Sequence, residues 1–242
     1  MAIRIQSGSQ AIIGPNTVTD GLVLYLDAAN QYSYPGSGIT WSDISRGGNN
    51  GTLVNGPTYS SANGGSIVFD GINNLASITN LPNYNTEVGT INMWINPTTT
   101  SNGVIFHQYF NDLNRVRLTY GPDRITFFTG NIITSQLEFS SSANSTTVNN
   151  WTNVTLCYNF VNDTFSIYIN GQLNASATSS TVNINASLGE ITIGCLKDFD
   201  NPPPYYSSFF QGRISMVQIY NRNLNSIEIL QNYNALKNRF RL

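Results

Sequence analysis

The sequence predicts an all-β protein, and three features of its hydrophobic pattern indicate this class. Apolar and polar residues alternate over most of the chain, which is the period of a half-buried β-strand. β-Branched and aromatic residues dominate the alternating runs, and Gly, Pro, Asn or Asp bounds each of them. No helical pattern lies between the runs. About ten strands without intervening helices are typical of a closed barrel or a two-sheet sandwich.

The predicted strands follow one another between residues 21 and 220. In chain order they are residues 21–27, 65–71, 89–97, 102–109, 115–120, 124–130, 151–160, 164–171, 189–194 and 209–220. Asn170-Gly171 accepts positive φ at both central positions of a turn, so it predicts a tight hairpin. Residues 161–164, "VNDT", form a similar turn. Together these turns predict an antiparallel meander over residues 151–173.

One long connection separates the last two of these strands. Residues 197–208, "KDFDNPPPYYSS", contain three consecutive prolines. Proline has no N–H to donate to a sheet, so we expect a stiff loop without ladder pairing. Rigid loops with exposed aromatic residues are frequent binding sites.

The last predicted element is the only helix. Asn225, followed three residues later by Glu228, predicts a capping box at its first turn. The apolar face then runs at helical spacing through Ile227, Leu230, Tyr233 or Asn234, and Leu236 or Lys237. An amphipathic helix that lies against the open end of a sandwich covers its apolar rim and a sheet edge. We therefore expect a structural lid.

The composition narrows the classes of partner. Of 242 residues only 10% are charged, and the net charge is −2. No basic run interleaved with aromatic residues is present, so nucleic acid is not expected as a partner. No apolar stretch approaches the roughly 20 residues that cross a bilayer, and "MAIRIQSGSQ" lacks the apolar segment of a secretion signal. Cys157 and Cys195 do not form a disulfide framework and are predicted to be free thiols on strands.

Residues 1–19 differ from the rest of the chain and are predicted to be an N-terminal arm. "MAIRIQ" alternates apolar and polar residues, and turn-forming residues follow. One interpretation is an edge strand or a frayed terminus of the same domain. The other is an assembly segment that adds a strand to the open sheet edge of a neighbouring subunit. The sequence leaves both open.

A resemblance to a known family rests on six motifs that occur in order. They are "FDGINN", "INMWINP", "WTNVTLCYNF", "IYINGQ", "ITIG" and "GRISMVQIYNRNLNSIEI". This set resembles the laminin-G-like, concanavalin-A-like lectin and glucanase superfamily, near its pentraxin-related branch, over about residues 20–240. The resemblance implies a two-sheet antiparallel jelly-roll sandwich, with one C-terminal α-helix, as a single domain over residues 20–242.

A second resemblance concerns the two ends of that domain. Residues 19–53 and 219–240 are similar to lectin-like structural proteins of tailed bacteriophages. This similarity implies a virion protein that is assembled in the host cytoplasm. The implied partners are other virion proteins and further copies of the chain. A bacterial surface glycan is the implied ligand.

Catalytic chemistry finds little support in the sequence. Glycoside hydrolysis needs two carboxylates on either side of one bond. None of the four glutamates has an acidic neighbour two to five residues away. His107 is the only histidine and lacks a framed nucleophile or orienting acid, so we expect it to be structural. Asp27, Asp43 and Asp70 lie at turns, where carboxylates usually accept hydrogen bonds from nearby backbone N–H groups.

Calcium is the cofactor that the pentraxin-like resemblance implies. That branch gathers oxygen ligands from two loops, which match Asp112, Asn114, Asp198 and Asp200 of this chain. The match is imperfect, because Leu196 and Lys197 stand where the branch has an acidic and an amide residue. An ammonium group opposes a divalent cation. A Lys–Asp ion pair that joins the two loops is the alternative.

The most probable ligand class by this reasoning is a glycan. Aromatic rings stack on the apolar faces of sugars, and Asn side chains pair with hydroxyl groups. The residues predicted to bind are Tyr109, Asn111, Tyr205 and Tyr206. The alternative is that these aromatic rings only pack the loops down. We therefore expect a non-catalytic virion structural protein, such as a capsid decoration, fibre or baseplate component, with a lectin-like domain. A free lectin is the alternative, and a glycoside hydrolase is disfavoured.

Overall fold

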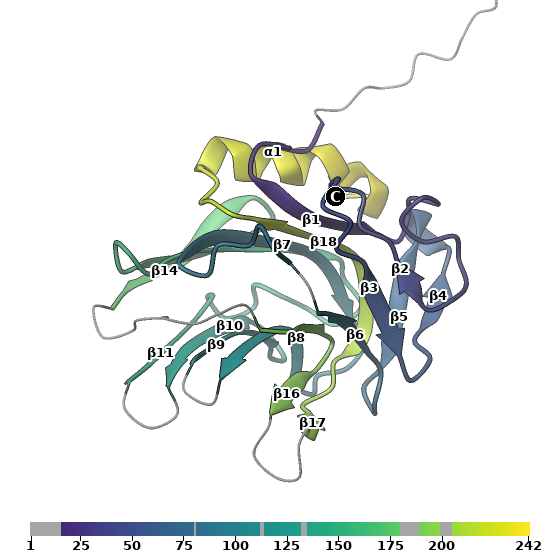
Figure 1. The fold of residues 1–242 in the computed structure, drawn as a ribbon, viewed down its shortest axis with the longest axis horizontal. Helices are drawn as coiled ribbons and strands as arrows, with labels where there is room; N and C mark the ends of the chain where they lie inside the picture. Colours follow the sequence, from purple (N-terminus) through teal and green to yellow (C-terminus); the bar gives the residue numbers. More distant parts are fainter. Residues whose placement is uncertain (1–15, 80, 112–113, 132–134, 180–188, 199–204) are drawn as a thin grey trace, which may run out of the picture.

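The computed structural model describes residues 16–79, 81–111, 114–131, 135–179, 189–198 and 205–242. Two antiparallel sheets lie face to face, and the helix α1 (Ser226–Leu236) lies on the outer side of one of them (Figure 1). The predicted all-β jelly-roll sandwich with one C-terminal α-helix is confirmed. No helix in the described ranges is long and apolar enough to span a membrane.

Sheet A is the sheet beneath α1. Its strand order is β14-β13-β12-β7-β18-β5-β4, and β1 pairs with β18 beside this path. The strands are β1 (Leu22–Asp27), β4 (Thr58–Ser60), β5 (Ser66–Asp70), β7 (Val88–Pro97), β12 (Thr152–Asn159), β13 (Thr164–Ile169), β14 (Gln172–Thr178) and β18 (Gln211–Tyr220).

Sheet B is the opposite layer and has the order β11-β10-β9-β8-β15-β6-β3-β2. Its strands are β2 (Thr40–Trp41), β3 (Gly51–Val54), β6 (Leu75–Ile78), β8 (Gly103–Asn111), β9 (Asn114–Tyr120), β10 (Ile125–Asn131), β11 (Ser135–Ser140) and β15 (Ile191–Ile193). Every strand predicted from the alternation is present. The meander is confirmed as well, because Asn170 and Gly171 have φ of 51° and 76° in the turn between β13 and β14.

A separate two-stranded ribbon corrects one prediction. β16 (Leu196–Asp198) pairs with β17 (Tyr205–Ser207), with Lys197 opposite Tyr206. The prediction that residues 197–208 form a loop without ladder pairing is therefore wrong at both ends of that stretch. The three prolines lie outside the described residues, and the pairing uses only residues on either side of them. We call β16 and β17 the ribbon.

Side chains from both sheets fill the space between the layers. On β7, Ile91, Met93 and Ile95 point into this core, while Asn92 and Trp94 are buried on the opposite face. Burial of each large apolar side chain contributes about 1.5–3 kcal/mol. Since both faces of β7 are buried, α1 and the residues after it must cover the outer face of sheet A.

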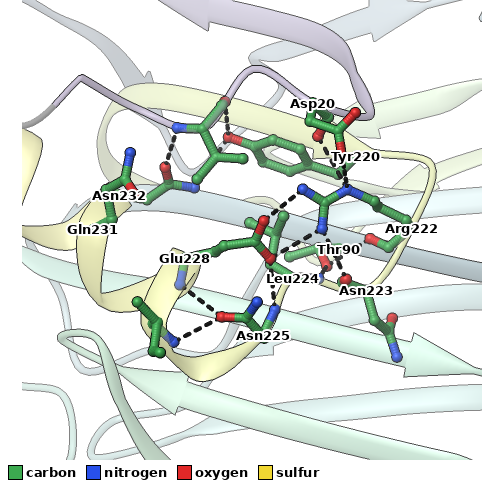
Figure 2. A network of polar contacts seen from close by, with 12 residues as sticks. Asp20, Thr90, Tyr220, Arg222, Asn223, Leu224, Asn225, Glu228, Gln231 and Asn232 are labelled. Carbon is green, nitrogen blue, oxygen red and sulfur yellow. Dashed lines mark hydrogen bonds and ion pairs between the residues drawn. The ribbon is translucent and has the colours of Figure 1, made fainter.

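The start of α1 has the predicted capping box. The Asn225 side chain accepts hydrogen bonds from the N–H groups of Ile227 and Glu228, both at 3.0 Å, and Glu228 accepts from the Asn225 N–H at 2.9 Å (Figure 2). Arg222 clamps the same carboxylate with two hydrogen bonds of 2.7 and 3.0 Å. These contacts fix the helix to the end of β18.

The buried face of α1 is not the predicted one. Ile227 is 77% exposed and Leu230 is 36% exposed, whereas Ile229, Asn232 and Leu236 are buried. The predicted apolar face is therefore wrong for its first two members. The cause is the burial of a polar residue, since the Asn232 side chain accepts from the Val18 N–H at 2.8 Å and donates to the Tyr220 hydroxyl at 3.0 Å.

The described end of the predicted N-terminal arm lies on α1. Val18 is buried, and its carbonyl accepts a hydrogen bond from the Tyr220 hydroxyl at 2.9 Å. The Gln231 side chain donates to the Asn16 carbonyl at 2.7 Å. Residues 16–19 are thus attached to the helix and β18, as Figure 2 shows around Tyr220 and Asn232. Residues 1–15 lie outside the described residues.

Candidate binding surface

The ribbon is anchored to sheet B through Lys197. The Lys197 ammonium forms an ion pair with Glu190, and Ser77 donates to the other oxygen of that carboxylate at 2.5 Å. The Lys197 N–H donates to Nδ1 of His107 at 3.3 Å. The ammonium also lies 5.8 Å from the centre of the Tyr206 ring, within the range of a cation–π contact. The ion pair that the described residues show is thus Lys–Glu, where the sequence suggested Lys–Asp.

His107 accepts the hydrogen bond from the Lys197 N–H that helps to anchor the ribbon. Its side chain is fully buried on β8. Burial lowers the pKa of His107 to about 3, and the nearby charges of Arg115, Arg117 and Lys197 act in the same direction. The imidazole is therefore neutral near pH 7, which suits its role as acceptor of the Lys197 N–H. This agrees with the expectation of a structural histidine.

Two of the three predicted tyrosines, Tyr109 and Tyr206, contact the residues of the Lys197–Glu190 ion pair, and Tyr205 is next to Tyr206 on β17. Tyr205 is 55% exposed and Tyr206 is partly buried, whereas Tyr109 is only 9% exposed. The Tyr109 N–H donates to the Glu190 carbonyl at 3.2 Å. Glu190, which anchors the ribbon through Lys197, therefore lies beside the end of β8. Tyr205 therefore offers the largest ring area for stacking. Asn111 is the last residue of β8, and its side chain lies outside the described parts.

The predicted calcium ligands are only partly within the described residues. Asn114 begins β9 and Asp198 ends β16, while Asp112 and Asp200 lie outside the described ranges. Among the residues that the structure describes, no three His, Cys, Asp or Glu side chains are grouped as a metal site. The side chains of Asn114 and Asp198 also lie outside the described parts, so the four predicted ligands are not tested. Calcium stays a prediction.

The other aspartates that invited a metal interpretation hold turns and strand ends. Asp43 accepts hydrogen bonds from the N–H groups of Tyr25, Ser45 and Asn49 at 2.8–2.9 Å. Asp70 accepts from the three N–H groups of residues 72–74 at 2.8–3.3 Å. The predicted role of Asp43 and Asp70 in backbone turns is confirmed.

Two further side-chain predictions have definite outcomes. The Asp27 carboxylate is held by the Arg239 guanidinium through hydrogen bonds of 2.7 and 2.9 Å, so it joins β1 to the C-terminal segment. Cys157 and Cys195 are free and buried, and burial raises the pKa of their thiols to about 11 and about 12. Cys157 lies on β12, as predicted, whereas Cys195 lies between β15 and β16.

A cavity away from the ribbon was missed at the level of sequence. It has a volume of about 440 Å³ and lies between the outer side of β1 and the loop after β2. Its walls include Thr17, Thr19, Tyr25, Ile44, Ser45 and Arg46. The two glycines of "SRGGNNG" indicated a turn, but nothing in the sequence indicated that β1 and this turn enclose a cavity.

Comparison with known families identifies the fold. Residues 69–230 match the family Laminin_G_3, described as the concanavalin A-like lectin/glucanases superfamily. The chain belongs to this superfamily. The match covers both strands that bracket the ribbon and the first turn of α1. Among curated proteins, none matches the sequence significantly.

Several solved structures with a similar fold are binding domains of toxins. The binding domain of Paraclostridial Mosquitocidal Protein 1 has a TM-score of 0.70 at 16% identity, over 90% of this chain and 52% of that one. The binding domain of botulinum neurotoxin DC in complex with SialylT has the same TM-score, identity and coverage. A structure of botulinum neurotoxin type C, whose cell entry depends on two ganglioside molecules, has a TM-score of 0.68 at 18% identity, over 94% and 53% of the two chains.

These likenesses concern the fold alone. The chain spans about half the length of the toxin binding domains that it matches. At 16–18% identity, similarity of backbone does not carry over the residues that bind a ligand. The surface of this chain must therefore be interpreted from its own side chains.

Proposed function

We propose that this chain is a non-catalytic, glycan-binding domain displayed on a virion, as part of a capsid decoration, fibre or baseplate. The observation that carries the proposal is the exposed Tyr205 ring on a ribbon anchored by Lys197 and Glu190. Membership of a lectin-like superfamily supports the ligand class. The toxin domains bind SialylT or depend on gangliosides according to their descriptions, which gives the same class a second support.

The ribbon has the properties of a preformed sugar platform. Stacking on a sugar is favourable when the ring is already ordered, because little conformational entropy is then lost on binding. Tyr206 is held by the Lys197 ammonium, and Lys197 is held by Glu190 and His107. The neighbouring Tyr205 is therefore presented on a fixed backbone. A single shallow site of this kind binds weakly, so display in several copies would supply useful avidity.

A binding role is favoured over hydrolysis by how the carboxylates are used. A glycosidase needs one carboxyl group as acid and a second one across the scissile bond. Glu190 has both oxygens engaged, by Lys197 and Ser77. Glu228 holds the helix cap and Arg222. These partners support assigning both glutamates to structure.

The virion role rests on the bacteriophage resemblance and on geometry. Asn16, the first described residue, contacts α1 on the outer side of sheet A. The ribbon lies on the far side of sheet B (Figure 1). Attachment to a particle through residues 1–15 would therefore leave the ribbon facing outward. Other virion proteins and further copies of the chain are the proposed partners, with a bacterial surface glycan as ligand. A free lectin is the alternative, and calcium at Asp112, Asn114, Asp198 and Asp200 remains part of the proposal.

A glycan array tests the binding role. The protein would be applied to bacterial polysaccharides with calcium and with a chelator, alongside Tyr205→Ala. Tyr32→Ala is the matched control, because Tyr32 is also exposed, at 79%, but lies far from the ribbon in the chain. We expect Tyr205→Ala to reduce the array signal at least about tenfold and Tyr32→Ala to leave it unchanged. The reason is that stacking of an aromatic ring on a sugar contributes on the order of 1–2 kcal/mol. No signal on any glycan, or equal loss in both variants, would count against the proposal.

A separate experiment tests display. Deletion of residues 1–15 leaves the contacts of Asn16 and Val18 with α1 in place, so the domain should fold unchanged. We expect the deletion to abolish incorporation into particles and to lower the oligomeric mass. Unchanged incorporation and mass would show that the arm has no assembly role, whatever the glycan array reports.

A further inference from the structure

The cavity beside β1 has the size and the lining of a small-ligand site. Its volume of about 440 Å³ lies within the range of about 300–1,000 Å³ that is usual for ligand pockets. Thr17, Thr19 and Ser45 contribute hydroxyl groups to it. Leu22 and the ring of Tyr25 contribute apolar surface. This combination of hydroxyl groups and apolar faces suits a sugar, which presents both kinds of surface.

The loop that closes the cavity is held rigidly. Each carboxylate oxygen of Asp43 accepts two hydrogen bonds. Oδ1 accepts from the N–H groups of Tyr25 and Ser45. Oδ2 accepts from the Ser45 hydroxyl and the Asn49 N–H. The Asn49 side chain donates to the Val23 carbonyl of β1 at 2.9 Å. The loop is thus fixed to β1 before any ligand binds. A preorganised wall lowers the entropy cost of binding.

Arg46 is the charged residue that lines this cavity, and its backbone is strained. Its φ is 87°, in the region that favours glycine, and Gly47 and Gly48 follow it. An L-residue other than Gly, Asn or Asp in this region costs about 1–2 kcal/mol. Among the described residues, the exposed guanidinium of Arg46 has no carboxylate partner in an ion pair. A strained backbone that carries an arginine rather than a glycine points to a use for its side chain.

The neighbouring carboxylates do not neutralise this arginine. Asp43 is surrounded by its four hydrogen-bond donors. Asp27 lies beneath the Tyr25 hydroxyl, at 3.4 Å, but is paired with Arg239. The cavity therefore offers one cationic fork to a bound anion. A guanidinium binds a carboxylate in a bidentate manner.

We infer that this cavity binds an acidic sugar residue, such as a hexuronic or sialic acid, with its carboxylate on Arg46 and its hydroxyl groups on Thr17 and Thr19. Leu22 and Tyr25 of β1 line the cavity, and β1 lies on the α1 side of the sandwich, away from the ribbon (Figure 1). It is thus a second binding site, independent of the one under "Proposed function". Two sites with different sugar preferences would let one domain engage a mixed, acidic polysaccharide.

The test is a calorimetric or NMR titration of the full chain with sodium glucuronate. Glucose is the neutral counterpart of the same shape, and sodium acetate tests the carboxylate alone. We expect saturable binding of glucuronate, at least about tenfold weaker binding of glucose because the charge-assisted pair is lost, and no saturable binding of acetate. No saturable glucuronate binding, or equal affinity for glucose, would overturn the inference. Saturable acetate binding would overturn the sugar assignment.

The variants separate a binding role from a structural one. Arg46→Asn removes the guanidinium but suits positive φ, so the fold should be kept. We expect it to lower glucuronate affinity about tenfold or more, and Thr19→Val to lower it a few-fold. Arg124→Gln is the control of equal charge change, because Arg124 pairs with Asp123 in the turn between β9 and β10, and neither residue lines the cavity. Tyr205→Ala should also leave glucuronate affinity unchanged, which keeps the two sites distinguishable. Unchanged affinity in Arg46→Asn would refute the site.

Discussion

The outer faces of the two sheets are covered in different ways. On sheet A, α1 lies over the outer face (Figure 1), and the rings of Tyr233 and Phe240 pack there on the buried Trp94. On sheet B, the short ribbon is hydrogen-bonded to the buried His107 of β8 and leaves Tyr205 in solvent. Apolar burial dominates the first cover, and a buried ion pair dominates the second. The first cover therefore contributes mainly to stability, and the second presents the exposed ring on which the proposed glycan site of the ribbon depends.

The cover of sheet A consists of stacked rings, with a chain of hydrogen-bonded amides beneath them. Trp94 lies between Phe240, at 4.2 Å, and Tyr233, at 5.7 Å. Deeper under α1, the Asn92 amide donates to Gln218 at 2.9 Å and accepts from Asn153 at 2.8 Å. Buried amides must be paired in this way, since each unpaired group costs about 1–3 kcal/mol. The helix is thus a part of the core.

The cover of sheet B contributes less to the stability of the fold. A buried ion pair gains Coulomb energy but loses hydration, and the two nearly cancel. We therefore interpret the Lys197–Glu190 pair as a contact that positions the ribbon rather than one that stabilises the fold. It holds β16 against the start of β15 and places the Lys197 ammonium beside Tyr206. The predictions that follow test this division, from the largest effect to the smallest.

Phe240→Ala should give the largest loss of stability. Phe240 is buried against both Trp94 and Trp151, with ring centres at 4.2 and 4.6 Å. Truncation of a buried phenylalanine costs about 3–5 kcal/mol. Chemical denaturation should show this loss. Leu242→Ala, at a 49% exposed residue, is the control and should change stability by less than about 0.5 kcal/mol. Similar effects from both changes would show that the C-terminal segment does not seal sheet A.

Lys197→Met should come next and should affect both stability and binding. The change leaves the partly buried Glu190 carboxylate without its cation, which costs about 1–3 kcal/mol. The double variant Lys197→Met with Glu190→Gln should recover most of that stability but not the glycan signal, because the ribbon still lacks its anchor. Full recovery of binding in the double variant would contradict a positioning role for the pair.

His107 should make stability depend on pH. Its pKa is about 3 in the folded chain and 6.5 in the unfolded one, so the unfolded state takes up the proton first. Stability should therefore be full above pH 6.5 and should fall by up to about 1.4 kcal/mol per pH unit between pH 6.5 and 3. Denaturation at several pH values measures this slope. His107→Asn should flatten it, and an unchanged slope would assign it to other groups.

Ile227→Ala should have the smallest effect. Ile227 is 77% exposed, whereas Ile229 is buried against β18. We expect a change below about 0.5 kcal/mol for Ile227→Ala and a loss of about 2–4 kcal/mol for Ile229→Ala. Thermal or chemical denaturation of the two variants shows which face of α1 packs on sheet A. The reverse order would restore the face that the sequence pattern suggests.

The fold was predictable from the sequence because strand alternation is a local signal. β7, β12 and β18 each bury long alternating runs, and the capping residues Asn225 and Glu228 are three positions apart. The phase of α1 was not predictable, because Asn232 is buried only through its bonds to Val18 and Tyr220, which are distant in sequence.

The binding surface was predictable only in part. Tyr205 and Tyr206 were identified as aromatic residues near prolines, but strands of three residues carry no period, so the ribbon was not. The ion-pair partner of Lys197 could not be predicted from the sequence either. Glu190 directly precedes β15, and Ser77 lies on β6, far away in the sequence. Ion pairs of this kind depend on tertiary structure rather than on spacing.

Hydrogen–deuterium exchange with a bound polysaccharide is the most direct test of the division between the two faces. The account predicts slower exchange in β16, β17 and the end of β8 on binding, with no change in α1 or in β18 beneath it. Tyr205→Ala should remove that protection. Protection that appears under α1 instead, while the ribbon exchanges as in the free protein, would contradict the account.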